Sequence, residues 1–123
     1  RAWIVHGKDG LDEMSISGAT EVAVLSGGHV THREVAPKDA GLAPSPLAAI
    51  RGGDAAHNAA ALTRLLAGEP GAYRDIVQIN AAAALMVAGA ADDLAAGAAL
   101  AARALDSGAE KAKLKDLIAA SNT

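Results

Sequence analysis

The feature that most constrains this fold is the uneven placement of secondary-structure signals along the chain. Short runs rich in β-branched residues lie in the first 35 positions, and alanine-rich segments with helical spacing fill the chain from residue 54 onward. Between them, residues 36–46 contain three prolines and a glycine, which interrupt any long helix or strand. This order predicts one α/β or α+β domain in which the strands come early and the helices follow.

Three strands are expected in the first part of the chain. Residues 2–5 form a continuous apolar run that ends at a His-Gly pair, the pattern of a strand covered on both faces. Residues 21–25 and 30–35 are joined by a turn with two consecutive glycines. Because glycine adopts the positive φ of a tight turn, these two runs predict a β-hairpin.

Helices are expected from residue 45 onward. Ser45 and Pro46 open a short helix that reaches Ile50, and Asp54 is the N-cap of a helix over residues 55–67. One side of this second helix is apolar and is expected to face the core, through Ala55, Ala59, Leu62, Leu65 and Leu66.

A central helix is predicted over residues 70–88, with Pro70 in its first turn, and its apolar second half should be buried. Asp92 or Asp93 caps an alanine-rich helix that reaches about residue 105. The last helix begins at a capping box in residues 107–110. Its apolar side, expected to face inward, consists of Leu114, Leu117 and Ile118.

Composition restricts the function further. The chain has 11 basic and 14 acidic residues, and no basic run alternates with aromatic residues, so a nucleic-acid-binding module is not expected. Cysteine is absent, which excludes a disulfide scaffold and a thiol nucleophile. The longest apolar stretch, residues 81–91, is too short to cross a bilayer, and we therefore expect a soluble, cytoplasmic protein without a membrane partner.

The strongest candidate for chemistry is the acidic loop, residues 8–18. Ligands bind at loops that leave the buried strands of an open α/β sheet. Asp12 and Glu13 are its best pair, since adjacent carboxylates can both turn toward one Mg²⁺ that also contacts substrate phosphates. Asp-Glu pairs in loops are also common as solvated surface, and the residues alone leave both interpretations open.

Other polar residues are weaker candidates. Residues 51–54, Arg-Gly-Gly-Asp, have the glycines of a phosphate-binding turn but not its spacing, and glycines that end one helix before an N-cap explain them. His29 and His32 are three positions apart in a strand, so they point to opposite faces and are not expected to share a metal. His6 is either functional or a hydrogen-bonded structural residue, and His57 is expected on a helix surface.

Several motifs occur together in a recognisable order. Residues 5–13 read Val-His-Gly-Lys-Asp-Gly-Leu-Asp-Glu, and Ser-Gly-Ala-Thr follows at 17–20. Asn58-Ala59 comes after the Arg-Gly-Gly-Asp segment, and Asn80 begins the run Asn-Ala-Ala-Ala-Ala-Leu. In this order the motifs resemble the carboxy-terminal portion of anthranilate phosphoribosyltransferase. The resemblance implies a fold of the α/β class in which residues 1–123 are the carboxy-terminal part of a larger catalytic domain.

The resemblance also implies a function. Members of this family transfer the phosphoribosyl group of phosphoribosyl pyrophosphate to anthranilate in tryptophan biosynthesis, with Mg²⁺ as cofactor. Their Asp-Glu pair binds Mg²⁺, and it corresponds here to Asp12 and Glu13. The complete enzyme is expected to be a homodimer formed through a helical domain that precedes these residues.

This sequence lacks parts of the family pattern. The family's Gly-Thr-Gly-Gly-Asp phosphate loop and its upstream anthranilate contacts are missing, and the chain starts at Arg1 directly before a strand. We therefore expect residues 1–123 to be part of a longer polypeptide and to be inactive alone. Two alternatives stay open: a relative of the nucleoside phosphorylases, and a non-catalytic alanine-rich interaction domain whose acidic loop is only solvated. The roles of His6, Asn58 and Asn80 are not assigned.

Overall fold

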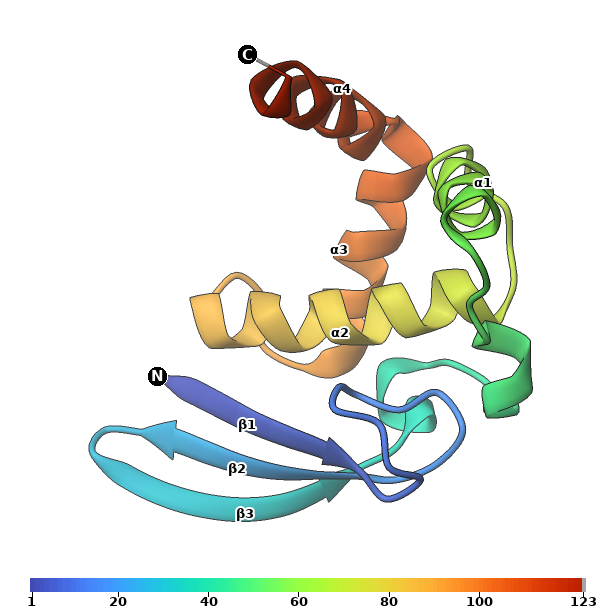
Figure 1. Ribbon diagram of the computed structural model, residues 1–123. Coiled ribbons are helices and arrows are strands. Elements are labelled where there is room, and N and C mark those ends of the chain that lie inside the picture. Colours follow the sequence, from blue (N-terminus) through green and yellow to red (C-terminus); the bar gives the residue numbers. More distant parts are fainter. Residues whose placement is uncertain (123) are drawn as a thin grey trace.

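The computed structural model describes residues 1–122 as a small antiparallel sheet with helices over one of its faces (Figure 1). Two 3₁₀ helices connect the sheet to the helical part. The elements in chain order are β1 (Ala2–Gly7), β2 (Thr20–Ser26), β3 (His29–Val35), η1 (Pro37–Ala40), η2 (Leu47–Ile50), α1 (Ala55–Leu65), α2 (Ala72–Ala88), α3 (Leu94–Ser107) and α4 (Ala109–Ser121).

The sheet has the strand order β1-β2-β3, and both neighbouring pairs are antiparallel. The predicted hairpin is confirmed as β2 and β3. Its turn residues, Gly27 and Gly28, have φ angles of 58° and 82°, the left-handed region that a two-residue turn requires. The expected α/β fold class with early strands is also confirmed.

The expectation that the first strand is covered on both faces is wrong. β1 lies at the edge of the sheet, and its side chains alternate between the two faces. Trp3 and Val5 pack against the core, whereas Ile4 on the other face is 75% exposed. One covered face is sufficient for an antiparallel sheet, so a continuous apolar run does not by itself establish burial on both sides.

The central helix is α2, as predicted. It lies over the sheet, and α3 packs across it (Figure 1). Ile76, Ile79 and Ala82 of α2 are at most 4% exposed. Together with Ala83 of the same helix they form one core with residues of the acidic loop, the sheet, η1 and α3, namely Met14, Ile16, Val22, Val35, Ala40, Leu94 and Ala98. Because two loop residues belong to this core, the acidic loop is held against α2.

Two predicted helix caps are confirmed. The Oδ1 atom of Asp54 accepts a hydrogen bond from the His57 N–H (2.8 Å) at the start of α1. The Oδ1 atom of Asp93 accepts one from the Ala96 N–H (2.7 Å) at the start of α3. Each carboxylate therefore satisfies a backbone donor that has no partner within the helix.

Three other helix starts differ from the prediction. The short helix is a 3₁₀ helix whose N-cap is Pro46, and α2 begins after Gly71, so that Pro70 lies in the preceding turn. The predicted capping box at 107–110 is wrong, because Ser107 still belongs to α3 and its hydroxyl donates to a carbonyl of that helix (2.7 Å). Gly108, with φ of 75°, separates α3 from α4, and the Ala109 N–H at the start of α4 donates to the Ser107 Oγ (3.3 Å) without a reciprocal bond from Glu110.

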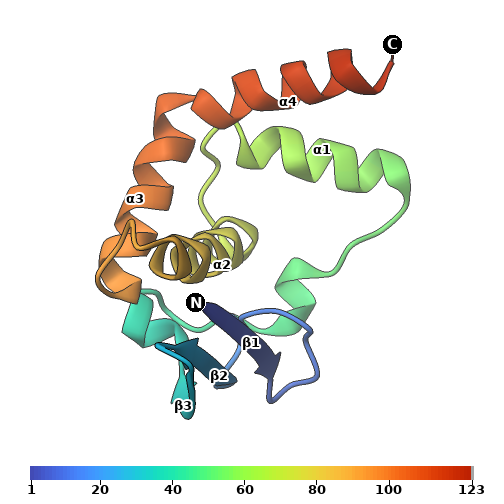
Figure 2. The same cartoon turned by 90° about the vertical axis from the view of Figure 1, so that its left-hand side faces the viewer.

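The apolar sides predicted for α1 and α4 are mostly not buried. Leu65 is the one buried residue of α1, and Leu117 and Ile118 of α4 are 64% and 53% exposed. Figure 2 shows both helices on the side of α2 away from the sheet. Helical spacing shows which residues share a face, but it does not show whether another element covers that face.

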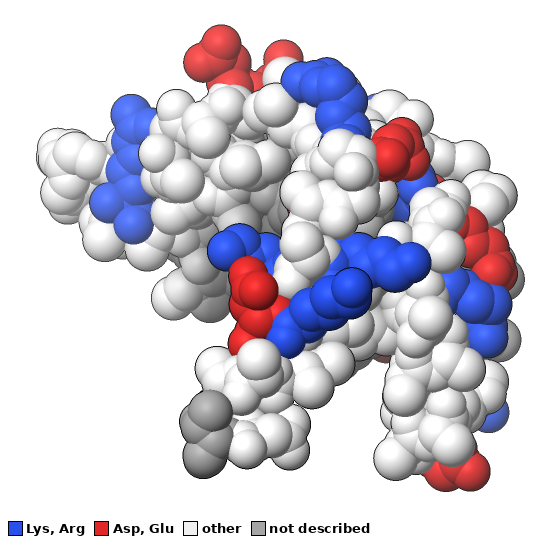
Figure 3. Space-filling view, turned by 90° about the horizontal axis from the view of Figure 1, so that it is seen from above, with Lys and Arg blue, Asp and Glu red and all other residues white. Residues whose placement is uncertain are grey.

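The surface carries charges of both signs. Figure 3 shows basic and acidic side chains scattered over the face seen from above, among wide areas without charge. Within residues 1–122, none of the helices combines the length and the apolar character needed to span a bilayer.

Candidate functional site

The acidic loop, residues 8–18, connects two antiparallel strands and must reverse direction. Backbone hydrogen bonds close its base. The Gly7 N–H donates to the Leu11 carbonyl (2.8 Å), and the Lys8 N–H donates to the Ala19 carbonyl (2.9 Å). Both ends of the loop are thereby fixed to the end of the sheet.

Asp9 connects the two halves of this loop by hydrogen bonds. Its Oδ2 accepts hydrogen bonds from the hydroxyls of Ser15 and Ser17, and its Oδ1 accepts one from the Leu11 N–H (3.2 Å). Partial burial acts to raise the pKa of Asp9, but these donors outweigh it and hold the pKa below its usual range. Asp9 is therefore an internal hydrogen-bond acceptor of the loop, while Asp12 and Glu13 are left for other partners.

The second half of the loop is buried. Met14, Ser15 and Ile16 are 1%, 0% and 0% exposed. The Ser15 N–H donates to Oγ1 of Thr20 (2.9 Å), and the Ile16 carbonyl accepts from the N–H of Ser45 (2.9 Å). The three residues directly after the acidic pair are therefore anchored in the core.

Asn80, in the middle of α2, also anchors this buried segment. Its Oδ1 accepts from the Met14 N–H (2.9 Å), and its Nδ2 donates to the Met14 carbonyl (3.0 Å). The sequence alone gives this residue no role. Its signal was an amide at the start of an apolar helical run, but no local pattern identifies a partner 66 positions away.

Asp12 and Glu13 are exposed between these anchored segments. Partial burial of its carboxylate, together with the neighbouring charge of Asp12, raises the pKa of Glu13 above its usual range. A bound cation would relieve this repulsion, and carboxylate oxygens are the ligands that Mg²⁺ prefers. The two side chains therefore fit a divalent cation.

The described residues supply only part of such a site. Within residues 1–122, no three His, Cys, Asp or Glu side chains gather as a metal-binding group. Mg²⁺ commonly keeps several waters and is held by one or two carboxylates together with substrate phosphates. Two adjacent carboxylates are sufficient for the protein's share of that arrangement.

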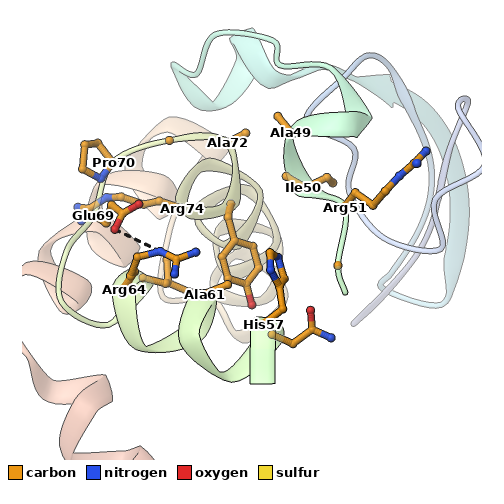
Figure 4. A pocket seen from close by; sticks show the side chains of 15 residues that line it. Ala49, Ile50, Arg51, His57, Ala61, Arg64, Glu69, Pro70, Ala72 and Arg74 are labelled. Atoms are coloured by element: carbon orange, nitrogen blue, oxygen red, sulfur yellow. Dashed lines mark ion pairs between the residues drawn. The ribbon is translucent and has the colours of Figure 1, made fainter. Parts of the chain in front are cut away.

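The Arg-Gly-Gly-Asp segment lies elsewhere, beside a cavity of about 500 Å³ between η2, α1 and the start of α2 (Figure 4). The N–H of Gly53 donates to Oδ1 of Asn58 (2.9 Å), and Nδ2 of Asn58 donates to the Gly53 carbonyl (3.1 Å). The backbone donor that a phosphate would need is already used, and Asp54 caps α1. These contacts agree with the expectation that the two glycines separate a short helix from the N-cap Asp54 and do not bind phosphate.

The four histidines are all exposed, and they lie on β1, β3 and α1 rather than in the acidic loop. His57 is on the surface of α1 and lines the cavity, as Figure 4 shows. Within the described part of the chain, the side chain of His6 makes no hydrogen bond, so the structural role considered for it finds no support.

Comparison with known proteins agrees with this arrangement. A family model described as "Glycosyl transferase family, a/b domain" matches residues 1–111. The chain belongs to this glycosyl transferase family. The anthranilate phosphoribosyltransferase of Rhodopseudomonas palustris (strain TIE-1) is 55% identical to this glycosyl transferase chain over 119 residues, which are 97% of the chain and 35% of that relative.

Solved structures give the same result for the fold. Anthranilate phosphoribosyltransferase from Thermus thermophilus superposes on the glycosyl transferase chain with a TM-score of 0.87 and 36% identity, over 97% of this chain and 35% of the other. The Saccharomyces cerevisiae enzyme in complex with PRPP and Mg has a TM-score of 0.78 over 86% of this chain and 31% of its own; at 24% identity it shows a shared fold. The predicted family resemblance is confirmed, and the chain spans about a third of the length of the curated relatives it matches.

Proposed function

We propose that this chain is the carboxy-terminal part of the catalytic domain of an anthranilate phosphoribosyltransferase, and that it contributes Asp12 and Glu13 as Mg²⁺ ligands. The observation that carries the proposal is the pair of adjacent exposed carboxylates between two anchored loop segments. Both the R. palustris and T. thermophilus relatives carry this enzyme name, and the yeast structure was solved with PRPP and Mg.

The chemistry of the transfer suits two carboxylates on a fixed loop. The bond between ribose C1 and the pyrophosphate oxygen breaks and the pyrophosphate leaves with the electron pair. The lone pair of the anthranilate amine nitrogen forms the new bond to C1, and the nitrogen then loses one proton. Mg²⁺ bound at the loop would neutralise the charge that develops on the leaving pyrophosphate. Asp12 and Glu13 would hold that ion, and the buried segment after them would keep both carboxylates at one position during the reaction.

The remaining parts of the active site are assigned to a longer polypeptide. These are the phosphate-binding glycine loop, the anthranilate contacts and the helical dimerisation domain that the family resemblance implies. Residues 1–123 alone are accordingly proposed to be inactive, and the homodimer belongs to the longer protein. The two alternative functions are not favoured by any observation at the loop.

Formation of N-(5-phosphoribosyl)anthranilate from phosphoribosyl pyrophosphate, anthranilate and Mg²⁺ tests the proposal, measured with the longer protein that contains this chain. Asp12→Asn and Glu13→Gln should each reduce kcat/KM by about 100-fold or more, because metal-ion stabilisation of a transition state is worth several kcal/mol. Raising the Mg²⁺ concentration should restore part of the activity.

The matched control is Asp92→Asn, which removes one exposed carboxylate outside the loop. It should leave kcat/KM within about twofold, as is usual for a surface site. Full activity of the two loop variants would contradict the metal assignment, and product formation by residues 1–123 alone would contradict the division of the active site.

A further inference from the structure

We propose that Asn80 is a positioning residue for the Asp12-Glu13 pair, acting from α2 on the peptide group that follows Glu13. The inference rests on the proposed Mg²⁺ role of the pair and adds a residue that is remote from it in the sequence. Asn80 and Met14 are 66 positions apart, yet the Asn80 side chain makes two hydrogen bonds to the Met14 backbone.

The geometry of these bonds determines what Asn80 controls. The Met14 N–H belongs to the peptide group that joins Glu13 to Met14, and it donates to Oδ1 of Asn80 (2.9 Å). The Met14 carbonyl belongs to the next peptide group and accepts from Nδ2 (3.0 Å). One side chain thus fixes the orientation of two successive peptide planes, and the first of them sets the backbone direction at Glu13.

Asn80 is itself firmly held. Its Nδ2 also donates to the Ile76 carbonyl one turn earlier in α2 (2.9 Å). Ile76 and Ile79, on the same helix, are 4% and 0% exposed. Asn80 therefore connects the acidic pair to a helix whose neighbouring side chains are buried in the core.

Only a carboxamide can make this set of contacts, because it offers one acceptor and two donors at one terminus. Aspartate at position 80 would keep the bond to the Met14 N–H but would lose both donated bonds and face two carbonyl oxygens. Alanine would remove all three bonds. The two replacements therefore differ in size and charge but share the loss of the donors.

Other contacts keep the loop attached when Asn80 is changed. The Met14 side chain is 1% exposed within the core, and the Ser15 N–H donates to Thr20 Oγ1 (2.9 Å). Substitution at 80 should therefore loosen the peptide beside Glu13 without detaching the loop. Mg²⁺ demands near-ideal octahedral geometry, and outer residues that orient ligands typically change metal affinity by about 10- to 100-fold.

The test is the Mg²⁺ dissociation constant of the longer protein, measured by calorimetry, together with the apparent Mg²⁺ constant and the anthranilate KM of the reaction. Asn80→Ala should weaken Mg²⁺ binding by about 10- to 100-fold and leave the anthranilate KM nearly unchanged. Asn80→Asp should also weaken it, although its added negative charge would by itself attract the cation. Asn80→Asp keeps the shape of the side chain and decides the question if Asn80→Ala does not fold.

Asn58→Ala is the matched control. Asn58 makes the same two-point contact to a backbone, with Gly53 at 2.9 and 3.1 Å, but on a turn outside the acidic loop. The Asn58→Ala protein should be less stable than the wild type but have an unchanged Mg²⁺ dissociation constant. An equal loss of Mg²⁺ affinity in Asn58→Ala and Asn80→Ala would overturn the positioning role.

Asp12→Asn and Glu13→Gln distinguish a failure of the Asn80 inference from a failure of the proposed metal site. If they weaken Mg²⁺ binding but Asn80→Ala and Asn80→Asp both stay within about twofold of the wild type, the inference about Asn80 is wrong and the proposed function stands. If Asp12→Asn and Glu13→Gln leave Mg²⁺ binding unchanged, the metal site itself is wrong.

Discussion

Gly97 of α3 lies directly against Ala82 of α2, so closely that a methyl group added at Gly97 would be 2.8 Å from the Ala82 Cα and 2.9 Å from its Cβ. Ala82 is completely buried at this crossing, and Ala98 beside it is 4% exposed. Small residues let the two helix backbones approach closely, which fills the core of a chain with only 2% aromatic residues.

This contact predicts that Gly97→Ala destabilises the protein. Alanine favours a helix over glycine by about 1 kcal/mol, but forcing an extra carbon into a packed core costs about 1–3 kcal/mol. The Ala82 atoms in the way are backbone and Cβ, which cannot rotate aside. We expect a net loss of about 1 kcal/mol in the free energy of unfolding, measured in urea.

The control is Gly18→Ala, because a methyl group at Gly18 would have no neighbour within 4 Å. Its free energy of unfolding should change by less than about 0.5 kcal/mol, as for other unconstrained positions. A Gly97→Ala protein as stable as the wild type would mean that the two helices can separate without loss.

The second prediction concerns how the stability contributed by Asp9 depends on pH. The pKa of Asp9 is lower in the folded protein than in the unfolded chain, because the Ser15 and Ser17 hydroxyls and the Leu11 N–H favour the charged form despite partial burial. Its stabilising contribution is therefore present above the unfolded pKa and is lost as the pH falls through the lowered value, below about pH 4. Asp9→Asn should be less stable than the wild type at pH 7, and the difference should shrink on acidification.

Urea denaturation of both proteins between pH 7 and pH 3 measures this difference. Asp39→Asn is a suitable comparison, since Asp39 is exposed and also accepts a backbone hydrogen bond, from the Ala36 N–H (2.8 Å), outside the loop. A stability difference for Asp9→Asn that stays constant with pH would show that the Asp9 charge is not the stabilising factor.

Features of the fold that depend on residues close together in the sequence could be predicted, and those that depend on distant residues could not. The hairpin at Gly27-Gly28 and the caps at Asp54 and Asp93 were predicted correctly, because each depends on residues within three positions of one another. Burial was predicted poorly for Ile4 and Leu117, because it depends on which other elements cover a face. The pattern within one strand or helix does not contain that information.

The site shows the same division. Asp12 and Glu13 were selected from a local motif, and their role as metal ligands stays a prediction. Asp9 has the same charge, but it turns toward Ser15 and Ser17, and only the three-dimensional path of the loop shows this. The contact of Asn80 with the loop joins distant segments and had no signal in the sequence beyond an amide in an apolar helix.

The third prediction concerns the link between α2 and the end of α3. The guanidinium of Arg74 donates to Asp106 Oδ1 (2.7 Å), to the Gly68 carbonyl (3.1 Å) and to the Ala102 carbonyl (3.5 Å), and its side chain is 11% exposed. Lysine carries the same charge at a single point and cannot reach these acceptors together. Arg74→Lys should therefore lower the free energy of unfolding by about 1–2 kcal/mol.

Lys113→Met is the comparison that tests whether the loss of an exposed ion pair lowers the free energy of unfolding as much as Arg74→Lys does. Lys113 pairs with Asp116 at 3.6 Å, but the two side chains are 85% and 71% exposed. Pairs of this kind contribute about 0.3–0.5 kcal/mol within a helix. Equal losses for Arg74→Lys and Lys113→Met in thermal unfolding would show that the multiple acceptors of Arg74 add nothing.

The last prediction is a conflict between stability and metal binding at Glu13. Burial and the charge of Asp12 raise the pKa of Glu13 in the folded protein, so its stabilising contribution is present at low pH and is lost as the pH rises through the raised pKa. At pH 7, without Mg²⁺, the ionised side chain therefore disfavours folding. Glu13→Gln removes that charge, and we expect this variant to have a higher Tm than the wild type in chelator.

Addition of Mg²⁺ should reverse the order. A ligand that binds the folded state raises the Tm by an amount that grows with its affinity, and the glutamine variant lacks one of the two carboxylates that would bind it. The wild-type Tm should therefore rise with Mg²⁺ concentration while that of Glu13→Gln stays nearly constant, and Asp92→Asn should follow the wild type. If Glu13→Gln is less stable than the wild type in chelator, the repulsion within the pair is not significant. If both proteins respond equally to Mg²⁺, Glu13 does not bind the ion.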